Sequence, residues 1–414
     1  MTLTIECPGS KSMTQRALLI AALGERPRAV VGALVCDDSR YLTALLGMLG
    51  VAVRWDGTRV EVSPLFPRLL RASGRPVFLG NAGTAVRFGA CLSLLSDGEL
   101  VIDGEPRMRQ RPIGALVEAL AQLGVTARYL GEAGYPPLGL SRGSTAGDRV
   151  RIDGSLSSQY ASGLMLVAPR LSSGLTVELT GALVSRPYLE MTAQMMRQAG
   201  AEVEADWDGD PPFIRVAPGG YRGGEPLVVE ADWSTASFLL AAGELSGRRP
   251  RIPNLVEPAR SLQGDAAFAQ HLERLRGDAA GGEHVIDLSD TPDLIAPLAA
   301  LALFASHPVQ LRNVAHARTK ECDRIAVLAE QLRRVGAEID EHEDGLTLRP
   351  LRPLTTPAEP VSLEPAADHR MAMAFGLVGL KLPHVTVLQP ECVSKSFPAF
   401  WSALARFTSE TGDA

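Results

Sequence analysis

LLGMLGVAVRWDGTRVEV, residues 45–62, places three local structural signals in one short stretch. A helix-like apolar segment stops at Gly50, where glycine can adopt the left-handed conformation that closes a helix. The apolar residues that follow are typical of a strand, Asp56-Gly57 is a strong hairpin turn, and residues 59–62 alternate as a second strand does. The stretch therefore predicts a helix that leads directly into a β-hairpin.

The same pattern recurs along the chain, at residues 116–127, 191–203 and 325–339, with a weaker copy at 268–277. The closing glycines are 74, 76, 77 and 59 residues apart, at Gly50, Gly124, Gly200, Gly277 and Gly336. A helix, a glycine and a strand occur in any α/β protein, but these copies share more than one feature. We therefore predict a repeated α/β unit of moderate size.

Length and composition narrow the class of protein. A chain of 414 residues is long for one core, so two domains are expected. The net charge of −6 and the 5% of aromatic residues argue against a nucleic-acid partner, and no apolar run is long enough for a membrane span. The five cysteines form no C-x-x-C pair, which predicts reduced thiols and neither a metal site nor a disulfide framework.

Residues 8–16, PGSKSMTQR, are the first candidate for binding an anion. Small and hydroxyl residues precede an apolar helix, with Lys11 at its start and Arg16 about one turn later. Free N–H groups at a helix N-terminus and nearby cations together favour phosphate or carboxylate. The alternative is a capped helix that carries surface charges.

Other segments repeat this form, a cation, hydroxyl or glycine at the start of a helix. They are residues 79–87, 103–112, 153–160, 185–188, 368–374 and 394–398. Each has a plain structural alternative, such as a cap or a solvated turn. A protein that binds two anionic groups explains the whole set better than a series of coincidences.

Two acidic residues stand out because of their neighbours. Asp293 enters an apolar helix, so it is either an N-cap or a functional acid or base. Glu321 lies between Lys320 and Arg324, which can share one face if a helix has already begun there. A carboxylate between cations is a candidate for proton transfer, and the alternative is a helix with ordinary ion pairs.

These motifs, taken together and in this order, resemble the 5-enolpyruvylshikimate-3-phosphate synthase family over nearly the whole chain. The matching segments are Gly9 to Ser12, Gly80 to Thr84, Glu105 to Met108 with Arg111 to Gly114, Ser157 to Gln159, Lys320 to Arg324 and Asp368 to Ala372. The resemblance implies transfer of the enolpyruvyl group of phosphoenolpyruvate to the 5-hydroxyl of shikimate 3-phosphate, with release of phosphate. This is a step of the shikimate pathway of aromatic amino acid biosynthesis.

The resemblance also implies a fold. It is a two-domain inside-out α/β barrel in which each domain holds three repeats of a βαβαββ-type unit. The discontinuous domain would comprise residues 1–8 and 231–414, and the other residues 9–230. The active site would lie in the cleft between them.

Residue roles follow from the resemblance by position. Phosphoenolpyruvate would be held by Lys11, Gly83, Thr84, Arg107, Gln159, Arg324, Arg370 and Lys395. Shikimate 3-phosphate would be held by Lys11, Ser12, Arg16, Ser157, Ser158, Gln159, Ser185, Asp293 and Lys320. The catalytic residues would be Asp293, Glu321 and Lys11. No metal or organic cofactor is implied, and no family role carries over onto Arg109 or Arg111.

Two positions depart from the family pattern. Phe88 stands where many relatives have proline, beside the phosphoenolpyruvate loop, which bears on inhibitor (glyphosate) sensitivity. His316 stands where some relatives place a substrate-contacting asparagine. Neither change removes a charged group.

Two rival functions predict a different sequence. A paralogous transferase for another phosphorylated cyclitol or sugar would differ in the hydroxyl-bearing segments, and a non-catalytic binder of anionic metabolites would be expected to lose Asp293, Glu321 or Lys11. Neither difference is seen. The N-terminus has neither a signal peptide nor a transit peptide, so a cytoplasmic location is expected. The expected partners are the two substrates, without nucleic acid or membrane, and the expected state is a monomer.

Overall fold

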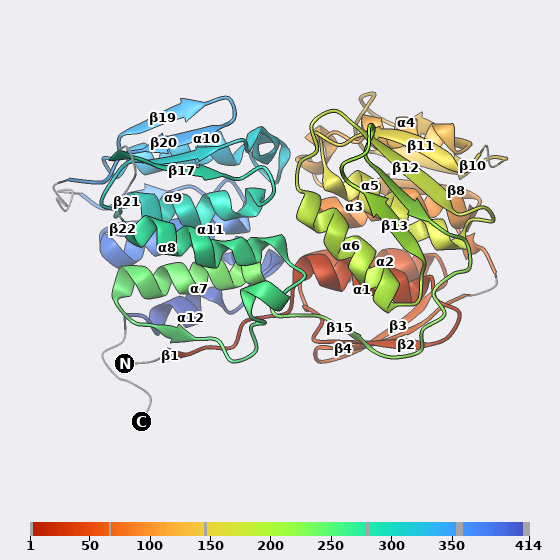
Figure 1. The fold of residues 1–414 in the computed structure, drawn as a ribbon, viewed down its shortest axis with the longest axis horizontal. Helices are drawn as coiled ribbons and strands as arrows, with labels where there is room; N and C mark the ends of the chain where they lie inside the picture. Colours follow the sequence, from red (N-terminus) through yellow and green to blue (C-terminus); the bar gives the residue numbers. More distant parts are fainter. Residues whose placement is uncertain (1–2, 66–67, 145–146, 278–281, 353–358, 409–414) are drawn as a thin grey trace. The chain divides into compact units, whose positions relative to one another are not determined.

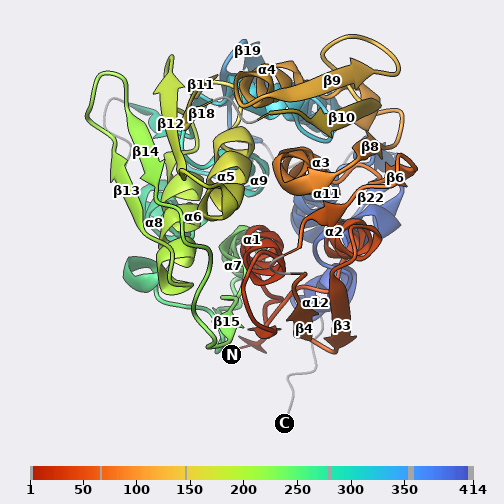
Figure 2. The same cartoon turned by 90° about the vertical axis from the view of Figure 1, so that its right-hand side faces the viewer.

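The computed structural model describes residues 3–65, 68–144, 147–277, 282–352 and 359–408. The chain divides into two compact units. Unit 1 comprises Met1–Pro8 and Glu230–Ala414, and unit 2 comprises Gly9–Val229. Each unit mixes helices and sheets, as the elements in Figures 1 and 2 show.

Unit 2 contains the predicted repeat three times. The third copy along the chain shows its plan, in the order β11 (Arg149–Asp153), α5 (Ser158–Val167), β12 (Leu175–Thr180), α6 (Arg186–Gln198), β13 (Val203–Asp206) and β14 (Phe213–Val216). The sheet order is β11-β12-β14-β13, in which β11 and β12 are parallel and the hairpin β13–β14 adds antiparallel to β12.

The other two copies in unit 2 follow the same plan. One has the sheet order β6-β8-β10-β9, built from β6 (Pro76–Phe78), α3 (Gly83–Leu92), β8 (Glu99–Asp103), α4 (Gly114–Gln122), β9 (Val125–Tyr129) and β10 (Leu138–Arg142). The remaining copy has the sheet order β15-β2-β4-β3. It takes its first strand from late in the chain, and comprises β15 (Leu227–Val228), α1 (Lys11–Ala22), β2 (Arg28–Val31), α2 (Asp37–Met48), β3 (Ala52–Asp56) and β4 (Arg59–Ser63). A short pair, β5 (Leu70–Arg71) and β7 (Ser96–Asp97), lies beside them.

Unit 1 contains one full copy of the plan. Its sheet order is β17-β18-β20-β19, and its elements are β17 (His284–Asp287), α9 (Ile295–Ala302), β18 (Val309–Arg312), α10 (Arg324–Arg333), β19 (Ile339–His342) and β20 (Gly345–Leu348). The other two copies have only the parallel strand pair among the described residues. One is β1 (Leu3–Thr4), α7 (Trp233–Ser246), β16 (Pro250–Arg251) and α8 (Phe268–Arg276), and the other is β21 (Val361–Leu363), α11 (His369–Lys381), β22 (Val385–Val387) and α12 (Phe400–Ala405).

The closing glycines distinguish the complete copies from the shorter copy that ends at α8. Gly50, Gly124, Gly200 and Gly336 have φ values of 93°, 87°, 89° and 88°, which confirms the left-handed caps. Gly277 has φ −80° and ψ 174°, so the prediction of a fifth cap was wrong. Only residues 277–283 separate α8 from β17, which is too few for two strands and a turn. The shorter spacing from Gly277 to Gly336 thus fits a repeat that has no hairpin among the described residues after α8.

Six helices form the interior of the two units. In unit 2, α1, α3 and α5 pack on one another, with the sheets outside them (Figure 2). In unit 1, α7, α9 and α11 do the same. These helices are buried on nearly every side, as expected of helices that are apolar all round. Most of the predicted site motifs stand at or next to the N-termini of these inner helices.

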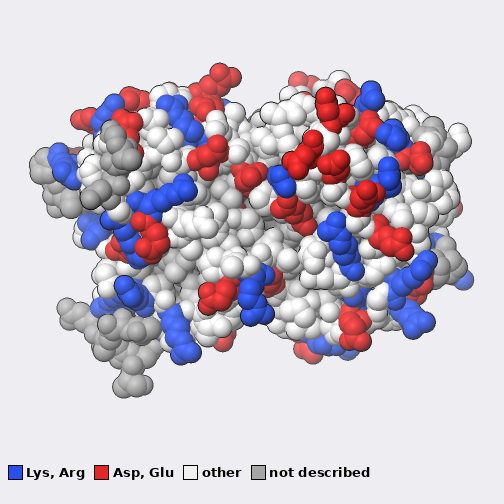
Figure 3. All heavy atoms as spheres, viewed as in Figure 1, with Lys and Arg blue, Asp and Glu red and all other residues white. Residues whose placement is uncertain are grey.

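The described surface fits an ordinary globular protein. Figure 3 shows Lys and Arg side chains interspersed with Asp and Glu on the visible face of each unit. All five cysteines are free thiols in the structure. Within the described ranges, no helix combines the length and the apolar character that a membrane span requires.

Candidate functional site

The first motif begins at the N-terminus of α1 in unit 2. Ser10 is the N-cap, and its hydroxyl accepts a hydrogen bond from the Met13 N–H at 3.5 Å. Lys11 is the first helical residue, and its Nζ lies 3.1 Å from Oδ2 of Asp38, a buried residue in the first turn of α2. The pair holds the Lys11 ammonium at the helix start, where backbone N–H groups also favour an anion.

Arg16 lies deeper than the sequence suggested. The residue is 2% exposed, and its guanidinium donates to Thr192 Oγ1 at 2.7 Å, to Ser162 Oγ at 3.1 Å and to the Ser12 carbonyl at 3.0 Å. It also lies over the ring of Phe88, 5.4 Å from the centroid. Burial lowers the pKa of Arg16 to about 10. Phe88, the departure from the family pattern, therefore packs against a predicted substrate-binding cation.

The glycine-rich loop before α3 is held by Arg111. Arg111 Nη1 donates to the carbonyl and the side-chain oxygen of Asn81, at 3.1 and 3.0 Å. A Cβ on Gly83 would lie 2.4 Å from Arg111 Nη2, so a larger residue there would have to displace the Arg111 guanidinium from the loop. The sequence attributed Gly83 to close approach of a ligand, and Arg111 provides a different reason. Thr84 is half-buried in the first turn of α3.

The three arginines that alternate over residues 107–111 have separate roles. Arg109 is half-exposed and pairs with Asp103, with 2.7 Å between Nη2 and Oδ2. Arg111 braces the glycine-rich loop. Arg107 is the half-buried N-cap of a short 3-10 turn, Met108–Gln110. Arg109 and Arg111 thus have structural partners, and the role of Arg107 in binding phosphoenolpyruvate stays a prediction.

The serine motifs cap two helices of unit 2. Ser157 is the N-cap of α5, and its hydroxyl accepts from the Gln159 N–H at 3.3 Å. Ser158 is buried and Gln159 is half-buried in the first turn of that helix. Ser185 caps α6 with φ 55° and ψ 35°, a left-handed conformation that is uncommon for a residue with a side chain. Strain of this kind gathers at functional positions.

In unit 1, Arg324 is the centre of a charge cluster. Its side chain is 2% exposed and contacts three carboxylates: Nε lies 2.8 Å from Asp368 Oδ2, Nη1 lies 2.7 Å from Asp293 Oδ1, and Nη2 lies 3.1 Å from Glu321 Oε2. Burial opposes its charge, but these three acids raise the pKa of Arg324 well above its ordinary value. Arg324 thus holds both predicted proton-transfer carboxylates in place.

Asp293 is not a helix cap. It lies in the 3-10 turn Pro292–Leu294, before α9, and its second oxygen, Oδ2, lies 2.9 Å from Arg370 Nη2. Burial alone would raise its pKa, but Arg370, Lys320 and Arg324 hold the pKa of this carboxyl well below the usual range. Asp293 is therefore ionised at neutral pH, as a proton acceptor must be.

Glu321 lies between two cations. Its Oε1 is 3.0 Å from Lys395 Nζ, and its Oε2 contacts Arg324. A shared helical face of Lys320 and Arg324 would require a helix that has already begun at Lys320, and α10 begins only at Arg324. Lys320 precedes the helix in extended conformation and still acts on Asp293 through its charge. The sequence placed Glu321 between Lys320 and Arg324, and the structure adds Lys395 as a cation that contacts it.

Four further residues complete these clusters. They are Asp38, which pairs with Lys11; Asp368, the buried N-cap of α11; and Asp265 with Ser234, whose hydroxyl donates a short hydrogen bond to the Asp265 carboxylate. Asp368 belongs to a predicted motif but was not itself predicted as a site residue. The only sequence signal for Asp38 and Asp265 is an acidic residue at the start of a helix, which is too common to be specific.

His316, the other departure from the family pattern, lies in the 3-10 turn Ala315–Thr319. Burial and, next, the charge of Lys320 lower its pKa to about 4. The imidazole is therefore neutral at physiological pH and adds no charge to the cluster. Among the residues that the structure describes, no group of three or more His, Cys, Asp and Glu side chains is arranged to hold a metal ion.

Comparison with known proteins gives a consistent result. A family model described as EPSP synthase (3-phosphoshikimate 1-carboxyvinyltransferase) matches residues 1–404. A 3-phosphoshikimate 1-carboxyvinyltransferase from Sulfurovum sp. is 38% identical over 432 residues, covering 98% of this chain and 96% of the relative, and one from Serratia proteamaculans is 38% identical over 419 residues with the same coverage. A solved structure of EPSP synthase from Acinetobacter baumannii is similar in fold, with a TM-score of 0.76 at 22% identity, covering 97% of this chain and 95% of that one.

Proposed function

The chain belongs to the EPSP synthase family and transfers the enolpyruvyl group of phosphoenolpyruvate to shikimate 3-phosphate in aromatic amino acid biosynthesis, and we propose which of its residues carry the reaction. The observation that supports the proposal most directly is the cluster around Arg324. It brings four predicted residues, Asp293, Glu321, Arg370 and Lys395, into one chain of ion pairs although they are far apart in sequence.

Phosphoenolpyruvate binding is proposed for residues of both units. Cations suit its phosphate and carboxylate because each charge-assisted hydrogen bond is strong. The proposed residues are Lys11, Gly83, Thr84, Arg107 and Gln159 of unit 2, and Arg324, Arg370 and Lys395 of unit 1. Shikimate 3-phosphate is proposed to use Lys11, Ser12, Arg16, Ser157, Ser158, Gln159, Ser185, Asp293 and Lys320.

These sets imply the remaining parts of the proposal. Each substrate would be bound by residues of both units. The active site is therefore proposed to lie in a cleft between two domains, which comprise residues 1–8 with 231–414 and residues 9–230. The compact units divide one residue earlier, after Val229. Buried inner helices with sheets outside them support an inside-out α/β barrel. We also propose a cytoplasmic monomer; the five free thiols fit a reducing compartment.

The chemistry requires two proton movements. The 5-hydroxyl of shikimate 3-phosphate loses a proton as its oxygen attacks carbon 2 of phosphoenolpyruvate, and carbon 3 gains a proton to become a methyl group. The resulting tetrahedral intermediate then loses phosphate while the methyl group returns a proton. We assign these transfers to Asp293 and Glu321, with Lys11 stabilising charge on the departing phosphate.

The field around Asp293 suggests how substrate binding activates it. Arg370 and Lys320, both proposed substrate ligands, keep the pKa of Asp293 low and so make it a weak base. A bound phosphate or carboxylate would offset part of their positive charge. Substrate binding is therefore proposed to raise the basicity of Asp293 when it is needed.

A coupled phosphate-release assay with both substrates tests the assignment. We expect release only when shikimate 3-phosphate and phosphoenolpyruvate are both present. Lys11→Met should lower kcat/KM by at least about 100-fold, and Lys381→Met, the same change at an exposed lysine that ends α11, should leave it unchanged. Equal kinetics for the two variants would reduce the first motif to a helix cap.

Asp293→Ala separates binding from chemistry. We expect it to keep most of its affinity for the substrates and to lose about 100-fold or more in kcat, because a general base contributes on that scale. A normal kcat in this variant would remove Asp293 from the mechanism.

A further inference from the structure

The sheet edge at β22 lacks the neighbour that its counterparts have. In each of the four complete repeats, the second parallel strand is flanked by an antiparallel strand of the hairpin: β2 by β4, β8 by β10, β12 by β14 and β18 by β20. β22 occupies the same place after β21 and α11, yet among the described residues only β21 pairs with it.

Backbone groups on this edge are oriented to accept another strand. Val361 N–H donates to the His384 carbonyl at 3.0 Å, and Leu388 N–H donates to the Leu363 carbonyl at 2.9 Å. Backbone groups alternate sides along a strand. The N–H of Val387 and the carbonyls of Val385 and Val387 therefore point away from β21.

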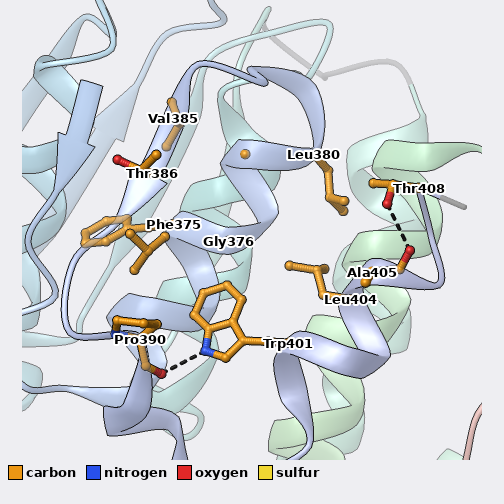
Figure 4. Close-up of a pocket in the computed structure, with 12 residues that line it drawn as sticks. Phe375, Gly376, Leu380, Val385, Thr386, Pro390, Trp401, Leu404, Ala405 and Thr408 are labelled. Carbon is orange, nitrogen blue, oxygen red and sulfur yellow. Dashed lines mark hydrogen bonds between the residues drawn. The ribbon is translucent and has the colours of Figure 1, made fainter. Parts of the chain in front are cut away.

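An apolar groove of about 410 Å³ lies beside this edge (Figure 4). Its floor is α11, one side is β22 and the other side is α12, with Phe375, Leu380, Val385, Trp401 and Leu404 among its lining residues. All three residues of β22 line it, as expected for a groove along a strand edge. In a complete repeat, the hairpin occupies the position between the second strand and the second helix. In the third copy of unit 2, for example, β14 pairs with β12 and β13 contacts α6.

The complete repeats also indicate what fits there. Each flanking strand buries two apolar residues separated by one position, namely Val60 and Val62, Leu138 and Leu140, Ile214 and Val216, and Leu346 and Leu348. Strand addition to an exposed edge gains main-chain hydrogen bonds, while alternate side chains enter the groove.

We propose that the β22 groove binds an extended peptide segment, antiparallel to β22, with apolar side chains at alternate positions. This site is separate from the residues proposed for catalysis. Its partner would be a protein that presents such a strand.

The probe is a peptide with the β4 sequence Arg-Val-Glu-Val-Ser, and the readout is the fluorescence of Trp401, which lines the groove. The control peptide Arg-Val-Val-Glu-Ser has the same composition but places its two valines on opposite sides of a strand. We expect saturable binding of the first peptide, at least 10-fold tighter than the second, with the signal lost in Trp401→Phe. Equal affinity for both peptides would overturn the proposal.

Matched variants test the location. Leu380→Asp changes the groove wall and should weaken binding at least 10-fold, whereas Leu388→Asp, at a leucine 42% exposed and outside the groove lining, should not. Both variants should keep normal phosphate release, which shows that they fold. Equal loss in both would place binding elsewhere.

Two other occupants are outcomes of the same experiment. A concentration-dependent dimer of the protein that Leu380→Asp abolishes would assign the groove to a second copy instead. Peptide binding that begins only after removal of residues 409–414 would assign it to the chain's own end. Either result overturns the proposal of a separate peptide partner.

Discussion

Replacing Arg324 with methionine tests how the charge cluster is held together. Methionine nearly keeps the length of the side chain but removes the cation that contacts Asp293, Glu321 and Asp368 at 2.7 to 3.1 Å. Removing one partner of a buried ion pair costs about 3–5 kcal/mol, because the remaining charge stays buried. The three contacts share one cation and are not additive, so we expect a loss of about 5 kcal/mol in the free energy of unfolding at pH 8.

The pH dependence makes this prediction specific. Without the cation, one of the groups that hold the pKa of Asp293 low is lost while burial still opposes its charge, so this pKa should rise. A group whose pKa rises in the folded state loses stability as pH rises through that value. The loss of stability caused by Arg324→Met should therefore be smaller at pH 5.5 than at pH 8. The wild type should show the opposite trend at acid pH, since the pKa of Asp293 is depressed and its contribution is lost as pH falls below 4.

The assay is urea unfolding followed by the fluorescence of Trp233 and Trp401, both in unit 1. The matched control is Arg349→Met, because Arg349 pairs with Asp340 at 2.8 Å in the same unit but is 44% exposed. Exposed pairs contribute little, so its unfolding midpoint should stay close to that of the wild type. If Arg324→Met shifts the midpoint no more than Arg349→Met, or by the same amount at both pH values, the account of the cluster is wrong.

Three further predictions address single positions. Burial, with a smaller contribution from Asp293, raises the pKa of Asp265 to about 7, so the stability that its protonated form provides is complete below pH 4 and is lost as pH rises towards 7. Asp265→Asn should therefore increase the free energy of unfolding by up to about 4 kcal/mol at pH 8 and by nothing below pH 4. An increase that does not vary with pH would contradict this. Gly336→Ala, at φ 88°, should cost about 1 kcal/mol in thermal or urea unfolding, whereas Gly277→Ala, at φ −80°, should be neutral or stabilising by a few tenths of a kcal/mol; equal effects would refute the assigned caps. Asp38→Asn removes the charged partner of the Lys11 ammonium group and should lower kcat/KM about 10- to 100-fold in the phosphate-release assay. Unchanged kinetics would mean that this ion pair does not position Lys11.

The local structure of this protein could be predicted from its sequence. Apolar periodicity, a capping glycine and a turn dipeptide act over a few residues, so the stretch 45–62 was enough to predict a helix and a hairpin, and its recurrence predicted the repeat. Helix starts with hydroxyls and cations are equally visible in the sequence, because the residues that make them are neighbours in the chain, as around Lys11, Ser157 and Arg370. The prediction of a left-handed cap at Gly277 was wrong because a glycine can also follow a helix in extended conformation.

Only the tertiary structure decided which charges meet. Arg324 lies 31 residues from Asp293 and 44 from Asp368, and no local rule pairs them. These residues meet in the folded protein because the inner helices α9 and α11 pack together and bring the charges at their N-termini near one another. The reason for Gly83 likewise depends on Arg111, from a different segment. Backbone conformation follows mainly from neighbours in the chain, whereas ion pairs and burial depend on packing between distant segments, and for that reason the sequence indicated the chemistry but not the contacts.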